Sequence, residues 1–218
     1  MTASPSSDFS ADALRALARA KLKPRLAVDD LRAERPARNG DFALSGPAPA
    51  ADVLALARPA AVLAPIVARS EGMTVLLTQR AAGLRAHSGQ IAFPGGQIDP
   101  GESPLEAALR EAREEIGLEP RLVEPLGWLD PYLTGTGFRI APLVALIDPA
   151  LSLTLNALEV DDVFETPLAF LMDPANHRLE EREWQGRRRK FYVMPHEGRY
   201  IWGATAGILR NLYERLFA

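Results

Sequence analysis

Five glutamates lie within fourteen residues, from Glu102 to Glu115, and a pair of glycines, Gly95 and Gly96, stands a few residues ahead of them. Three of them, Glu111, Glu114 and Glu115, are spaced i, i+3 and i+4, which places them on one face of a helix. Like charges at this spacing repel one another, and a divalent cation would reverse that interaction. Because Mg²⁺ and Mn²⁺ prefer carboxylate oxygens, the spacing indicates a metal site. An exposed acidic helix is the alternative for the three glutamates taken alone.

The segment that carries the glutamates has clear helix signals at both ends. Ser103 can cap the start, Pro104 suits the first helical position, and Glu106 completes a capping box. Gly117 fits the left-handed position after the last turn. We therefore predict a helix over residues 103–116.

The residues before this helix extend the pattern. Gly95 and Gly96 free the backbone to turn, so that a carbonyl can face the metal site. After Gly96 come five residues, a glutamate, seven residues and then "REAREEIGL". This string resembles the Nudix box, G-x5-E-x7-R-E-U-x-E-E-x-G-U, where U is apolar. The matching residues are Gly96, Glu102, Arg110, Glu111, Glu114, Glu115, Gly117 and Leu118, whereas Ala112 is small for the remaining apolar position.

The resemblance to Nudix hydrolases implies a fold and a reaction. The implied fold is α+β, an α/β/α sandwich with a central mixed sheet, and the implied reaction is hydrolysis of a diphosphate linked to another moiety. Bound Mg²⁺ or Mn²⁺ would neutralise phosphate oxygens and activate water. The implied metal ligands are Glu111, Glu114, Glu115 and the Gly96 carbonyl, the bracing pair is Glu102 with Arg110, and the candidates for the general base are Glu114 and Glu159.

A second pattern narrows the substrate. The stretch "LLTQRAAGLRAHSGQIAFPGG", residues 76–96, resembles a signature of the coenzyme A pyrophosphatase branch, and this resemblance extends over about residues 60–216. It implies cleavage of coenzyme A or a derivative into 4′-phosphopantetheine and adenosine 3′,5′-bisphosphate. The predicted substrate-binding residues are Arg80, Arg85, His87, Gly89 and Phe93. Arginine forks match phosphate oxygens, although surface salt bridges would also account for the arginines and loop fixation for the histidine.

Two other functions stay open on the sequence. One is hydrolysis of ADP-ribose, NADH or a nucleoside triphosphate, because the Nudix box indicates the reaction and not the substrate. The other is a ligand sensor without catalysis, which the intact glutamate set argues against. A basic run over residues 187–190 is compatible with the 3′-phosphate of coenzyme A, but a solvated hairpin is the favoured interpretation.

The remaining sequence predicts the elements that must position these residues. We expect a helix over residues 10–22 capped by Ser10, and an irregular Pro- and Ala-rich lead-in over 35–61. This divides the chain into an extension, 1–59, and a Nudix domain, 60–218. The domain is predicted to contain a hairpin of strands 61–69 and 73–81, strands at 90–96, 121–134, 138–148, 177–186 and 187–198, and helices at 161–173 and 203–217.

Composition limits the partners and the compartment. The 218 residues carry a net charge of −3, which does not favour nucleic acid, and contain no cysteine, which excludes disulfides and thiolate zinc sites. We find neither a signal peptide nor a run of about 18 apolar residues, so we expect no membrane span and a cytoplasmic protein. The expected partner is a small-molecule substrate. A homodimer is one expected state, because Nudix hydrolases are often dimers.

Overall fold

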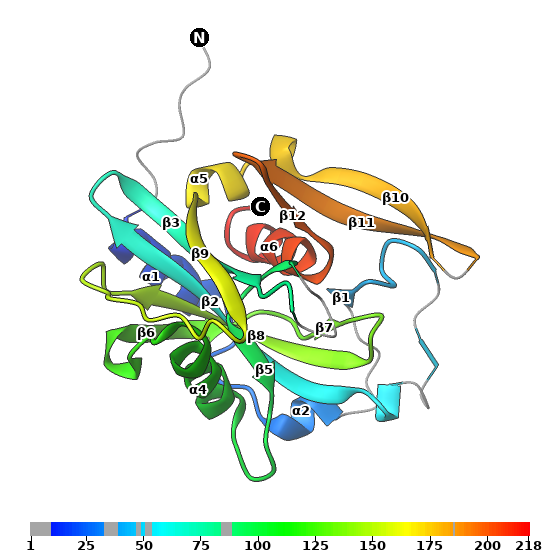
Figure 1. Cartoon of the computed structure of the whole chain (residues 1–218), viewed down its shortest axis with the longest axis horizontal. Coiled ribbons are helices and arrows are strands. Elements are labelled where there is room, and N and C mark those ends of the chain that lie inside the picture. Colours follow the sequence, from blue (N-terminus) through cyan, green and yellow to red (C-terminus); the bar gives the residue numbers. More distant parts are fainter. Residues whose placement is uncertain (1–9, 33–38, 47–48, 51–53, 84–88, 185) are drawn as a thin grey trace.

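The computed structural model describes residues 10–32, 39–46, 49–50, 54–83, 89–184 and 186–218 (Figure 1). Within these residues the chain forms a nine-stranded mixed sheet and a separate three-stranded antiparallel sheet. The strands are β1 (Asn39–Gly40), β2 (Arg58–Arg69), β3 (Gly72–Arg80), β4 (Ile91–Ala92), β5 (Gly95–Gln97), β6 (Val123–Trp128), β7 (Tyr132–Leu133), β8 (Phe138–Ile147), β9 (Val160–Pro167), β10 (Arg178–Trp184), β11 (Arg187–His196) and β12 (Arg199–Trp202). The helices are α1 (Ala11–Lys21), α2 (Val28–Arg32), α4 (Pro104–Ile116), α5 (Leu168–Leu171) and α6 (Gly203–Leu216), with 3₁₀ turns η1 (Pro120–Leu122) and η2 (Pro174–Asn176).

The large sheet is organised around β2 and β8. These two strands pair in parallel, and the order across the sheet is β1-β7-β8-β2-β3-β4, with β5 on β2, β6 on β8 and β9 on β3. Side chains alternate along β2, so that Ala64 and Ile66 enter one apolar core while Leu63 and Val67 enter the other. Helices α1 and α6 cover the first core, and α2 and α4 cover the second (Figure 1). The predicted sandwich with a central mixed sheet is confirmed.

The locally encoded elements form where the sequence predicts them. Strands β2 and β3 make the expected hairpin, closed by the pairing of Arg69 with Gly72. Helix α4 starts with the complete capping box of Ser103 and Glu106 and ends at Gly117, whose φ of 69° is left-handed. Helices α1 and α6 and the β10–β11 hairpin are also present.

The helix predicted over residues 161–173 is wrong in its first half. Residues Val160–Pro167 form β9, which pairs antiparallel with β3, and the helix α5 spans Leu168–Leu171 alone. β9 contains β-branched Val163 and Thr166, which suit a strand. Pairing with the edge of β3 therefore decides the conformation, and Pro167 precedes the short helix instead of interrupting it.

The strand predicted over residues 90–96 is divided in two. Strand β4 pairs with β3, β5 pairs with β2, and Phe93 and Pro94 lie between them. The Pro94 carbonyl still accepts a hydrogen bond from the Leu63 N–H at 2.9 Å. The proline has no N–H to donate, so the chain leaves one neighbour and joins another at this point.

The described parts of the predicted extension pack on the domain. Leu14, Ala18 and Leu22 of the first helical segment are buried in the core beneath α6. The predicted irregular lead-in is regular at β1, which pairs in parallel with β7. Residues 1–9 lie outside the described residues. No helix in the described part of the chain has the length and apolar character needed to cross a membrane.

We predict that α1 contributes to the stability of the whole fold. Leu14 is 2% exposed, and Leu14→Ala should lower the free energy of unfolding by about 2–5 kcal/mol, since it removes buried methyl groups and leaves a cavity. Chemical denaturation provides the measurement. The exposed Arg19→Ala on the same helix is the control and should change stability by less than about 0.5 kcal/mol. Equal effects of the two substitutions would mean that α1 is not part of the core.

Candidate active site

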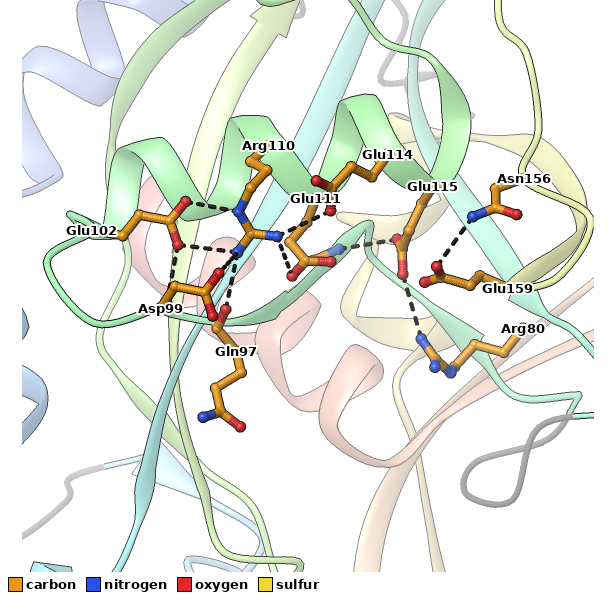
Figure 2. Close-up of polar contacts among 11 residues, drawn as sticks. Arg80, Gln97, Asp99, Glu102, Arg110, Glu111, Glu114, Glu115, Asn156 and Glu159 are labelled. Atoms are coloured by element: carbon orange, nitrogen blue, oxygen red, sulfur yellow. Dashed lines mark hydrogen bonds and ion pairs between the residues drawn. The ribbon is translucent and has the colours of Figure 1, made fainter.

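Arg110 is at the centre of the polar network on α4 (Figure 2). Its Nε and Nη2 atoms donate to the two carboxylate oxygens of Glu102 at 2.8 and 3.0 Å, and Nη2 also donates to the Gln97 carbonyl at 3.2 Å. Its Nη1 atom donates to Glu111 at 2.8 Å and to Glu114 at 3.0 Å. The predicted ion pair between Glu102 and Arg110 is therefore present and joins the loop before α4 to the helix. The Arg110 hydrogen bonds lower the pKa of Glu102.

Glu115 is the most buried carboxylate of this helix. It is 2% exposed, and its Oε2 accepts a hydrogen bond from the Gly95 N–H at 3.1 Å. Its Oε1 lies 3.5 Å from the Arg80 guanidinium, a long ion pair. Burial raises the pKa of Glu115 to about 7, against the effect of Gly95 and Arg80, and the charges of Glu111 and Glu159 raise it further. A proton or a cation is therefore needed to offset this charge cluster.

The two glycines of β5 let the backbone approach the helix and the sheet. A methyl group at Gly96 would overlap the carboxylate of Glu111, and one at Gly95 would overlap the Ala61 carbonyl and Val62 of β2. Burial raises the pKa of Glu111, although Arg110 acts in the opposite direction. A side chain at residue 96 would therefore push the Glu111 carboxylate out of its present position.

Glu159 reaches the site from a distant part of the sequence. The pairing of Val160 with Arg80 places it at the end of β3, where its carbonyl accepts from the Ala81 N–H at 2.9 Å. Its Oε1 accepts from Asn156 Nδ2 at 3.1 Å, and its carboxylate lies near those of Glu111 and Glu115, whose pKa values it raises (Figure 2). The site thus brings together carboxylates from α4 and from the start of β9.

The arrangement of the carboxylates bears on the predicted metal. Within the described residues, no three His, Asp or Glu side chains converge closely enough to hold an ion as they stand, since Arg110 engages Glu111 and Glu114 while Gly95 and Arg80 engage Glu115. The donor set nevertheless fits a divalent cation, because it consists of oxygen atoms and the pKa values of two of its carboxylates are raised by burial. A cation would relieve this unfavourable charge.

A cavity of about 800 Å³ extends from these carboxylates. Glu111, Glu115 and Glu159 line it, whereas Glu114 is not among its lining residues and is 55% exposed on its side chain. The remaining wall comes from strands β2 to β5, from β7 and β8, from α6, from the β10–β12 sheet and from the segment after β1. Its size lies within the range typical of small-ligand sites, roughly 300–1,000 Å³.

Asp41, in the segment after β1, is a wall residue that the sequence did not indicate. It accepts hydrogen bonds from the Tyr132 hydroxyl at 2.7 Å and from the Gly135 N–H at 2.6 Å. Gly207 of α6 packs against the Tyr132 ring so closely that a methyl group would overlap it. No nearby sequence pattern could identify Asp41 as a residue of the cavity wall, because it is brought there by the parallel pairing of β1 with β7.

The predicted substrate-binding residues have different positions. Arg80 lines the cavity beside Glu115. Gly89 closes the loop after β3 by donating its N–H to the Arg80 carbonyl at 3.0 Å. Phe93 is 4% exposed and belongs mainly to the apolar core, although it also borders the cavity. Arg85 and His87 lie outside the described residues.

Comparison with known proteins identifies the family. The family model described as the NUDIX domain matches residues 57–187, more than half of the chain. The chain belongs to the Nudix family. This Nudix hydrolase is 42% identical over 156 residues to proteins from Cronobacter sakazakii and Salmonella newport, each named "Uncharacterized Nudix hydrolase NudL", and the match covers 71% of this chain and 81% of theirs.

Solved structures include more distant Nudix relatives. The Nudix hydrolase RenU of M. smegmatis is 20% identical, with a TM-score of 0.47 over 72% of this chain and 84% of that one. An Ap4A hydrolase of C. elegans is 22% identical, with a TM-score of 0.45 over 50% of this chain and 80% of that one. Nudix hydrolases generally use divalent metal ions such as Mg²⁺ or Mn²⁺.

We predict that cation binding depends on pH through Glu115. Its pKa of about 7 means that a cation must displace a proton at lower pH. The affinity for Mn²⁺, measured by calorimetry on the metal-free protein, should fall by up to about tenfold per pH unit below pH 7 and level off above it. Glu115→Gln, as the control, should bind Mn²⁺ more weakly and with a flatter pH profile. Unchanged affinity in Glu115→Gln would exclude this carboxylate as a ligand.

Proposed function

We propose that this Nudix hydrolase cleaves the diphosphate bond of coenzyme A or a derivative, giving 4′-phosphopantetheine and adenosine 3′,5′-bisphosphate. The observation that carries the proposal is the meeting of two sequence patterns in one cavity. Arg80, from the stretch that resembles the coenzyme A pyrophosphatase signature, lies 3.5 Å from Glu115 of the Nudix helix. Both side chains line the same cavity. A substrate phosphate bound by Arg80 would therefore lie close to Glu115.

The proposed reaction is attack of water on one phosphorus of the diphosphate. The water oxygen forms the new P–O bond, the bond to the bridging oxygen breaks, and the departing phosphate retains that oxygen. A divalent cation held by Glu111, Glu115 and the Gly96 carbonyl, with Glu114 joining from the helix surface, would supply charge neutralisation. Arg80 adds a fixed positive charge for the phosphate oxygens.

We assign Glu159 as the general base in preference to Glu114. Glu159 lines the cavity, whereas the Glu114 side chain is 55% exposed and bonded to Arg110. Asn156 orients the Glu159 carboxylate by donating to Oε1 at 3.1 Å. The other oxygen, Oε2, is the atom we assign to accept the proton of the attacking water. An acceptor fixed in this way suits general-base catalysis.

Glu159→Gln should lower kcat by about 10²–10⁴-fold with little change in KM, because the amide cannot accept the proton. Steady-state kinetics with coenzyme A is the measurement. Asp161→Asn is the matched control, since Asp161 is an exposed carboxylate two residues away that bonds to the Ala82 N–H. Its kcat should stay within about twofold of the parent value. A near-normal kcat in Glu159→Gln would transfer the role of base to Glu114.

The substrate is tested by incubating the purified protein with coenzyme A and Mn²⁺ and separating the products by chromatography. We expect 4′-phosphopantetheine and adenosine 3′,5′-bisphosphate in equal amounts, and no products after chelation of the metal. Acyl-coenzyme A, ADP-ribose, NADH and a nucleoside triphosphate are assayed in parallel. Faster turnover of one of the last three than of any coenzyme A derivative would contradict the proposal, and tight binding without turnover would indicate a sensor.

A further inference from the structure

The end of the cavity formed by the β10–β12 sheet differs in chemistry from the glutamate end. We call it the aromatic-basic end and define it by Arg182, Arg189, Lys190, Phe191 and Trp202, all of which line the cavity. In Figure 1 this sheet and α4 lie on opposite sides of the molecule. The cavity therefore offers the glutamates of the Nudix helix at one end, and three cations with aromatic rings and the carboxylate of Glu183 at the other.

The two rings are inclined to each other, so a flat ligand stacked on one would meet the edge of the other. Phe191 and Trp202 meet edge to face with centroids 5.5 Å apart, and both are only partly buried. The Arg182 guanidinium lies 5.9 Å from the Phe191 ring and 5.8 Å from the Trp202 ring. Aromatic faces beside arginine are a common way to hold a nucleobase, through stacking and cation–π contacts.

Glu183 and Asp41 also line this part of the cavity, but in the described part of the chain neither carboxylate forms an ion pair with its cations. Arg182 and Arg189 are direct partners in the β10–β11 ladder, a pairing that is unfavourable for like charges. Among the described residues, no ion pair within 4 Å joins Arg182, Arg189 or Lys190 to a carboxylate, whereas the adjacent Arg188 pairs with Glu181 at 3.1 Å. A ligand with a dianionic group would relieve the repulsion.

The backbone beneath these cations is held in place from two directions. The Lys190 N–H donates to Ser45 Oγ at 2.6 Å, which ties β11 to the segment after β1. Arg189 Nη1 lies so close to Gly135 that a methyl group on this glycine would be 2.6 Å from it. The Gly135 N–H donates a hydrogen bond to Asp41. The loop after β7 thus makes room for the Arg189 side chain. These contacts place Arg189 at a defined point of the cavity wall.

We propose that the aromatic-basic end binds a purine nucleotide that carries an additional phosphate monoester. The base would stack on one of the two rings and meet the edge of the other, and the monoester would meet Arg189 and Lys190. This inference rests on the proposed function, in which the adenosine 3′,5′-bisphosphate half of coenzyme A is such a group. An apolar acyl chain would fit this end poorly, because it would leave the cations without partners. The end would then select substrates by their 3′-phosphate.

The kinetic test compares coenzyme A with dephospho-coenzyme A, which lacks the 3′-phosphate. The parent protein should have a higher kcat/KM for coenzyme A, and Arg189→Ala should remove about 10- to 100-fold of that preference through KM, since charge-assisted hydrogen bonds are strong. The rate with dephospho-coenzyme A should change little. Arg188→Ala, next to it in sequence and paired with Glu181, is the control and should keep the preference. Equal losses on both substrates would overturn the proposal.

A binding measurement separates this inference from the proposed reaction. Calorimetry on the metal-free protein compares adenosine 3′,5′-bisphosphate with adenosine 5′-monophosphate. We expect tighter binding of the bisphosphate, loss of the difference in Arg189→Ala, and its retention in Arg188→Ala. If coenzyme A is not hydrolysed but this pattern holds, the proposed function fails and the binding site stands. If coenzyme A is hydrolysed but the two nucleotides bind equally well, the site is wrong and the reaction stands.

Discussion

The guanidinium of Arg110 makes the interaction on which the rest of the site depends. Three carboxylates of α4 and its preceding loop would repel one another without a cation among them. Arg110 binds Glu102 through Nε and Nη2, so its Nη1 atom alone contacts Glu111 and Glu114. Those two carboxylates can consequently turn toward another cation while the clamp between loop and helix stays intact. Arg110 thereby joins the loop to the helix with one set of atoms and contacts the candidate metal ligands with another.

The same region contains a buried charge that lowers the stability of the folded chain. Glu115 is almost fully buried with a raised pKa, and the Gly95 N–H of β5 donates to it from a position where a side chain would overlap β2. Burying an ionised carboxylate without a full partner is unfavourable. Two apolar cores, one on each face of the large sheet, offset this cost. The unfavourable charge is confined to one end of a cavity whose other walls are mostly neutral or basic.

How far the sequence predicted the structure depended on the range of the interactions. Helix α4, its capping box and the glutamate face were predictable, because their signals lie within a few residues of one another. The segment at residues 161–173 was mispredicted, since pairing with β3 outweighs its local pattern. Glu159 was a candidate only by family resemblance, and Asp41 was not one at all. Both are placed by strand pairings between segments about 80 to 90 residues apart in the chain, which a local pattern does not encode.

The packing of Gly207 against Tyr132 has a consequence for how the molecule is assembled. Tyr132 bonds to Asp41, and α6, which carries Gly207, also covers α1, so segments from the beginning, middle and end of the chain meet at one wall. During synthesis the chain emerges from the ribosome in sequence order. Helix α1 can pack on β6, and Asp41 can bond to Tyr132, before α6 has been made, but the contacts of both regions with α6 form only afterwards. Residues 104–116 can become helical early, but the cavity that Glu111 and Glu115 line is complete only when α6 is in place.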